Sequence, residues 1–112
     1  MTLNFPHPQN DAPLFIPLRI ADWEVLPDRH LLRRGDREHT LEPRLMQVLV
    51  HLASRPGVVV SRTDLLDLVW GETVVQEEAL TQAVSQLRRV MGDDPKNPTI
   101  IETVPKRGYR LV

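Results

Sequence analysis

The 112-residue sequence contains no cysteine. This absence excludes disulfide bonds, thiol catalysis and cysteine-ligated zinc, and it fits a reducing compartment. The chain also lacks any apolar run near the roughly 18 residues that a membrane-spanning helix requires. Residues 1–17 have neither the basic patch nor the apolar stretch of a secretory signal peptide. We therefore expect a cytoplasmic protein.

Signatures of catalytic and cofactor sites are missing as well. The four histidines lie apart, without the His-Glu-x-x-His spacing of a metal site. There is no Gly-x-Ser-x-Gly elbow and no glycine loop that could cradle phosphates. Asp93 and Asp94 lie in a turn before Pro95, where aspartate is common for local reasons. We expect no enzyme activity, no cofactor, no metal and no small-molecule substrate.

Positive charge is not in excess overall, because 14 basic residues are balanced by 15 acidic ones and the formal net charge is −1. The distribution is uneven. Residues 84–112 hold six basic and three acidic side chains, so they carry a net charge of +3 and residues 1–83 carry −4. DNA binding requires a basic face rather than a basic whole, so a nucleic-acid partner is compatible with this balance.

The length and an apolar content of 41% suit one small globular domain. Prolines among polar residues predict a flexible tail over residues 1–16, and the domain is expected over residues 17–112. Short apolar runs between Leu18 and Leu41, separated by turn dipeptides, predict three or four antiparallel strands. A two-residue hairpin with Gly35 first is expected in this region.

Three helices are predicted next. Pro43 suits a first helical position, and Pro56-Gly57 is expected to end that helix. Val58–Val60 reads as a short extended bridge. Ser61 followed by Asp64 resembles a capping box for a second helix that ends near Trp70-Gly71. The third helix is expected from about residue 77 to residue 91, with Gly92 as its stop.

The third helix has one apolar stripe, formed by Leu80, Val84, Leu87 and Met91. After a turn region, residues 99–104 and 109–112 read as two strands of a hairpin, with Lys106 and Arg107 at its tip and Gly108 giving the turn its freedom. The fold class is therefore α+β. We predict a winged helix-turn-helix with an N-terminal antiparallel sheet, three helices and a C-terminal β-hairpin wing.

The residues from Leu41 to Val112 strengthen this prediction. They include the segments LEPRLMQVLVHLASRPGVVVSRTDLLDLVWG, VVQEEALTQAVSQLRRVMGDD and IIETVPKRGYRLV. The chain resembles the OmpR/PhoB-type DNA-binding domains over about 95 residues, and TVPKRGYRL resembles the CadC/ToxR-like branch of transcriptional regulators. Regulators of that branch carry this domain at the N-terminus, often before a linker, a membrane span and a sensor. The resemblance therefore also allows the cytoplasmic part of a membrane-anchored regulator.

The resemblance implies sequence-specific binding of double-stranded DNA, with the helix at about 77–91 in the major groove and the wing at 105–109 near the minor groove. It further implies contact with RNA polymerase through the loop 71–76 and a homodimer on tandem half-sites. Gln82 and Gln86 share one helix face and suit adenine. The full set of predicted DNA-binding residues is Trp70, Glu78, Thr81, Gln82, Ser85, Gln86, Arg88, Arg89, Thr103, Lys106, Arg107 and Tyr109.

Each of these residues also has an ordinary structural interpretation. The polar face of the third helix can be simply solvated, and Arg88 and Arg89 can serve only the helix dipole. The hairpin cations can discourage edge pairing, while Tyr109 and Trp70 can pack. The alternative function is accordingly a winged-helix protein-interaction module without DNA affinity.

Overall fold

The computed structural model describes residues 17–112, so the predicted tail over residues 1–16 lies outside the described residues. Four strands come first: β1 (Leu18–Ile20), β2 (Trp23–Leu26), β3 (Leu31–Arg34) and β4 (Arg37–Thr40). They form one antiparallel sheet in the order β1-β2-β3-β4. The prediction of antiparallel strands is confirmed. Gly35 opens the two-residue turn between β3 and β4 with a φ of 61°.

Three helices follow the sheet: α1 (Pro43–Ala53), α2 (Arg62–Trp70) and α3 (Glu78–Met91). The predicted cap of α2 is confirmed, since the Ser61 hydroxyl accepts a hydrogen bond from the Asp64 amide at 3.0 Å. Gly92 ends α3 in the left-handed region with a φ of 75°. Within residues 17–112, no helix has the length and apolar character needed to cross a membrane.

The end of α1 differs from the prediction. The helix ends at Ala53, ahead of the expected stop at Pro56-Gly57. A proline disfavours the helical conformation of the residue before it, which removes Arg55 from the helix. The Arg55 amide instead donates to the Leu52 carbonyl at 3.2 Å, a tighter turn that closes the helix early.

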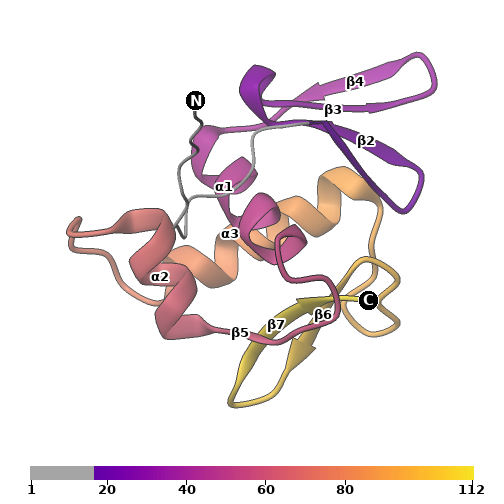
Figure 1. Cartoon of the computed structure of the whole chain (residues 1–112). Coiled ribbons are helices and arrows are strands. Elements are labelled where there is room, and N and C mark those ends of the chain that lie inside the picture. The colour runs from indigo at the N-terminus through magenta and orange to yellow at the C-terminus, as the bar shows by residue number, and fades with distance from the viewer. Residues whose placement is uncertain (1–16) are drawn as a thin grey trace, which may run out of the picture.

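A second sheet forms at the other end of the molecule, as Figure 1 shows. Its strands are β5 (Val60–Ser61), β6 (Ile101–Val104) and β7 (Gly108–Leu111), in the order β5-β7-β6. The β6–β7 hairpin is the predicted wing. The extended segment expected at Val58–Val60 is a strand only at Val60–Ser61, which is β5. This strand pairs with β7, with Val60 opposite Tyr109.

The role predicted for Gly108 was wrong. The left-handed residue of the wing turn is Lys106, with a φ of 65°. Gly108 lies on β7 instead, between β5 and β6, where a Cβ would stand 2.0 Å from the Val60 carbonyl oxygen. Glycine is required there because the neighbouring backbone leaves no room for a side chain.

The helices pack between the two sheets, with α1 and α3 crossing at the centre (Figure 1). The predicted apolar stripe of α3 is buried throughout, and Leu80 and Leu87 have no exposed surface. Trp23 links the first sheet to the far end of α3. Its indole nitrogen donates to the Met91 carbonyl at 3.1 Å, in the last turn of a helix, where carbonyls have no partner within the helix.

Asp93 joins the end of α3 to the start of the wing. Its carboxylate accepts hydrogen bonds from the Thr99, Ile100 and Ile101 amides at 2.7, 3.2 and 2.8 Å, from the Thr99 hydroxyl and from the Asp94 amide. Burial raises the pKa of Asp93, but these hydrogen bonds outweigh it and hold the pKa below the ordinary value of 3.8. The local role expected for this turn aspartate is confirmed.

Substitution Gly108→Ala should destabilise the protein by about 3 kcal/mol, because β5 has to move away from β7. Urea unfolding measures this loss. Gly57→Ala is the matched control: Gly57 also has a positive φ, of 75°, but nothing lies within 4 Å of an added Cβ. The control should lose only about 1 kcal/mol through backbone strain. Equal losses in the two variants would contradict the close-approach explanation.

Substitution Asp93→Asn should lower the free energy of unfolding by about 1–3 kcal/mol at neutral pH, because the negative charge is lost and the side-chain NH2 group cannot accept from the Ile101 amide as Oδ2 does. The folded-state pKa lies below the unfolded one, so the carboxylate stabilises the fold above about pH 4 and this contribution fades as the pH falls further. Thermal unfolding from pH 3 to pH 7 should show the two proteins converging in acid. Asp94→Asn, at an exposed position, should change little; a constant gap between Asp93→Asn and the wild type would refute the assignment.

Candidate nucleic-acid interface

The face of α3 opposite its buried stripe is open to solvent. Seven of the predicted DNA-binding residues lie on this helix and were expected on its outward face. Six of them are exposed, and these are Glu78, Thr81, Gln82, Ser85, Gln86 and Arg89. The helix thus presents a polar row over more than two turns, with amide, hydroxyl, carboxylate and guanidinium groups. This row is the first part of the candidate interface.

Arg88 does not follow the prediction of an outward side chain. It is only 8% exposed, and its guanidinium Nη2 donates to the Ile101 carbonyl at 2.9 Å and to the Thr103 hydroxyl at 2.8 Å. The physical reason is the wing itself, because β6 packs against this flank of α3 and offers acceptors that a free helix lacks. Arg88 therefore attaches α3 to strand β6 of the wing, and Thr103 is its side-chain partner.

Arg62, at the first position of α2, was not identified from the sequence, yet it connects three elements. Its Nη1 donates to the Tyr109 hydroxyl at 2.7 Å, and its Nη2 donates to the Thr81 hydroxyl at 2.9 Å and to the Glu77 carbonyl. Its Nε is 3.1 Å from the Glu77 carboxylate. The exposed row of α3 and the wing strand β7 are thereby fixed side by side.

The neighbours of Arg62 favour its charged form. Burial lowers the pKa of Arg62, but Glu77 and Tyr109 together raise it above its ordinary value. One signal in the sequence could have identified the residue: a cation at the N-terminal end of a helix opposes the helix dipole. An arginine placed there despite this cost indicates an interaction outside its own helix.

The wing tip carries two exposed cations, Lys106 and Arg107. The Lys106 backbone is held in the left-handed region, which is uncommon for a residue with a side chain. Thr103 and Tyr109 face each other across the hairpin, and Tyr109 is only 4% exposed. The packing role considered for Tyr109 is confirmed, while its hydroxyl remains at the edge where Arg62 reaches it.

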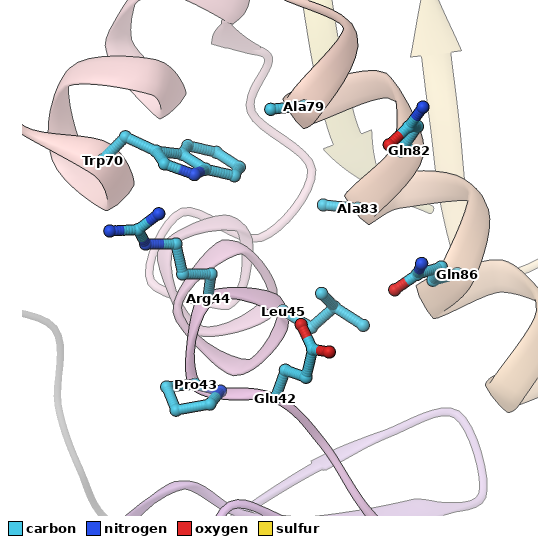
Figure 2. A pocket seen from close by; sticks show the side chains of 9 residues that line it. All are labelled: Glu42, Pro43, Arg44, Leu45, Trp70, Ala79, Gln82, Ala83 and Gln86. Carbon is cyan, nitrogen blue, oxygen red and sulfur yellow. The ribbon is translucent and has the colours of Figure 1, made fainter. Parts of the chain in front are cut away.

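Trp70 packs at the end of α2, with 7% of its surface exposed, which confirms its expected structural role. It also lines a cleft of about 470 Å³ between α1, α2 and α3, shown in Figure 2. Gln82 and Gln86 line the α3 side of this cleft, and Arg44 extends from α1 toward the indole ring (Figure 2). The Arg44 guanidinium carbon stands 5.7 Å from the ring centroid.

Together, these residues form an exposed polar helix face with the cationic tip of the wing hairpin beside it. Within residues 17–112, no three potential ligands from histidine, aspartate and glutamate gather at one point to hold a metal ion. The exposed groups are donors and acceptors spread over a long surface rather than converging in a pocket. Such a surface suits an extended, grooved and anionic partner.

Comparison with known proteins agrees with this geometry. Residues 36–111 match the family described as "Transcriptional regulatory protein, C terminal". The chain is 43% identical over 96 residues to the transcriptional activator CadC of Escherichia coli, covering 85% of this chain and 19% of CadC. It is 48% identical over 100 residues to the cholera toxin transcriptional activator of Vibrio cholerae, covering 88% of this chain and 32% of that protein. The chain thus spans a fifth to a third of these relatives.

Solved structures share the fold. The DNA-binding domain of E. coli CadC superposes with a TM-score of 0.76 at 39% identity, over 90% of this chain and 94% of that domain. The DNA-binding domain of Klebsiella pneumoniae RstA, solved with its RstA box, has the same TM-score at 23% identity and supports the fold alone. The predicted winged helix-turn-helix is therefore confirmed. The chain belongs to the family of C-terminal domains of transcriptional regulatory proteins, which are the DNA-binding domains of OmpR/PhoB type.

Proposed function

We propose that this chain regulates bacterial transcription, in the cytoplasm, by reading double-stranded DNA with α3 in the major groove and the wing at the minor groove. One observation carries the proposal. Arg62 bonds both Thr81 on the exposed row of α3 and Tyr109 on the wing, so the two projections lie on one side of the molecule. A duplex laid along α3 would meet the wing tip without rearrangement of the protein.

The centre of the α3 row is suited to base edges. Gln82 and Gln86 lie one turn apart, and a glutamine can form two hydrogen bonds with adenine. Glu78 can accept from the amino group of cytosine, and Arg89 can donate to guanine or to a phosphate. Ser85 lies between these side chains and can contact either kind of group.

Phosphate contacts would hold the domain in register. Lys106 and Arg107 are the exposed cations of the wing, and a narrow minor groove attracts such groups. Trp70, Thr81 and Tyr109 supply an indole N–H and two hydroxyls at the edges of the row. We assign Arg88 and Thr103 an indirect role, because the arginine is buried and bonded to β6 rather than free to reach DNA.

Two further partners are proposed from the family. The loop between α2 and α3 would contact RNA polymerase, and the 97% exposure of Val74 in this loop favours a protein partner there. A homodimer on tandem half-sites would follow the arrangement implied by the resemblance. A pulldown of RNA polymerase with a loop variant such as Val74→Asp would distinguish a protein contact from a merely exposed side chain.

Substitution Lys106→Gly should weaken binding to every DNA sequence, because one phosphate contact is lost, and the salt dependence should fall by about one ion. The same change should stabilise the fold by about 1 kcal/mol, because glycine adopts the left-handed backbone of Lys106 without strain. Fluorescence anisotropy and thermal unfolding measure the two effects. Arg37→Gly, an exposed cation at the tip of the first sheet, is the control and should leave DNA affinity unchanged. Unaltered binding by Lys106→Gly would exclude the wing from the interface.

Substitution Gln82→Ala or Gln86→Ala should alter the preferred sequence rather than the general affinity. A bidentate contact contributes about 1–3 kcal/mol of discrimination, so preference at one base pair should fall roughly 5- to 150-fold. Selection from random duplexes, repeated for the wild type and each variant, reads this out. If the wild type enriches no sequence, the chain is an interaction module and the proposal fails.

A further inference from the structure

Arg62 gives most of its hydrogen bonds to fixed parts of the fold and one to an exposed side chain. Its Nη1 donates to the Tyr109 hydroxyl, and its Nη2 donates to the Thr81 hydroxyl and to the Glu77 backbone carbonyl. The guanidinium carbon also lies 5.6 Å from the centroid of the Tyr109 ring, within cation–π range. The remaining donor, Nε, is 3.1 Å from a carboxylate oxygen of Glu77. The cation is therefore held in place even without this last partner.

The Glu77 carboxylate has no second role in residues 17–112. Glu77 is the N-cap residue of α3, yet its side chain makes no capping hydrogen bond. Its only ion pair within the described residues is with Arg62, and 72% of its side-chain surface is exposed. Such exposed pairs add little to stability, because water screens the charges and both side chains lose freedom. The carboxylate can therefore leave Arg62 without much loss of stability.

Arg62 also lies at the place where the proposed function expects a phosphate. Thr81 and Tyr109 are assigned to the DNA backbone there, and their hydroxyl oxygens are 2.9 and 2.7 Å from nitrogens of this one guanidinium. A hydroxyl that accepts from arginine keeps its own hydrogen for an outside acceptor. A phosphate that reaches both hydroxyls therefore comes close to Arg62, and the anion already beside that guanidinium is Glu77.

We propose, on the basis of the proposed DNA binding, that Glu77 competes with DNA for Arg62. In the free protein the carboxylate occupies Nε, and a backbone phosphate displaces it when α3 and the wing bind a duplex. Two anions at one guanidinium repel each other, so the phosphate binds more weakly than it would to an unpaired Arg62. Glu77 then limits the affinity for every sequence, because a backbone phosphate carries no sequence information. The preference between sequences stays with Gln82 and Gln86.

The test is substitution Glu77→Gln in the whole chain. Glutamine has the same size and can still accept a hydrogen bond from Nε, but it carries no charge. Binding to all duplexes should strengthen about 3- to 10-fold, and the salt dependence should steepen by up to about one ion. Glu72→Gln is the matched control, because Glu72 is an exposed acid in the loop before α3 and its loss changes the net charge equally. The control should change affinity less than about 2-fold, and equal gains in both variants would overturn the proposal.

A double-mutant cycle identifies Arg62 as the target of the competition. Arg62→Gln should weaken binding, and adding Glu77→Gln to it should bring no further change, because the competitor has lost its partner. Arg62→Lys keeps a charge beside Glu77, so Glu77→Gln should still strengthen binding in that background. This second background also serves if Arg62→Gln does not fold. A gain that is the same with and without a cation at position 62 would refute the competition, as would loss of the gain in the lysine variant.

Stability and affinity should change in opposite directions. The unfolding temperature of Glu77→Gln should fall by no more than about two degrees while DNA binding strengthens, because the exposed pair contributes little to the fold. Weaker DNA binding by Glu77→Gln would show that the carboxylate positions Arg62 for DNA, and it would refute this inference while leaving the proposed function standing. Absence of any DNA binding by the wild type would remove both.

Discussion

Helix α3 buries its apolar side in the core and leaves its polar side exposed to solvent, and the other elements of the structure are arranged around this requirement. Its apolar stripe is buried, with α1 as its main neighbour, while its opposite face carries only polar side chains. Burial of four large apolar side chains stabilises the fold by several kcal/mol, about 1.5–3 kcal/mol for each. That contribution allows a 14-residue helix to present a polar surface that adds nothing to its own stability.

Polar links set the position of α3 more narrowly than apolar contact can. Trp23 holds its last turn to the first sheet, and Asp93 holds the following residues to the base of the wing. Arg88 and Arg62 attach its wing-facing flank to β6 and β7. Hydrogen bonds have fixed lengths and directions, whereas apolar surfaces can slide. The separation of α3 from the wing is therefore specified by side chains that are mostly outside the proposed DNA contacts.

Because largely separate residues position α3 and contact DNA in this proposal, the chain needs no large positive net charge. The chain needs cations only where phosphates would lie, and a formal total of −1 does not prevent a basic rim on one side. Several arginines serve the fold instead: Arg33 pairs with Glu24 at 2.9 Å, and Arg110 pairs with Glu102. Counting basic residues would therefore overestimate the interface, because Arg33, Arg88 and Arg110 are engaged by other residues of the fold.

The sequence by itself determined the elements and their order. Helical and strand periods, Pro43, the Ser61 cap and Gly92 depend on neighbours within a few residues, so local rules were sufficient. The same local rules placed Arg88 on the exposed face. Its position on the helix is away from the apolar stripe, but helical periodicity does not show that β6 packs against this position and buries the side chain. They also attributed Gly108 to a turn, although its neighbour Val60 is 48 positions earlier in the chain.

Only the tertiary structure decided which polar groups are free. Arg62 binds Tyr109 across 47 positions, and Arg88 is held by Ile101 and Thr103 of β6 rather than left open to solvent. Hydrogen bonds between distant segments depend on the packing of the whole core, and no pattern within one segment encodes them. The sequence therefore determined which surfaces exist, and the packing of α3 against the wing and α1 determined which donors on those surfaces remain for a partner.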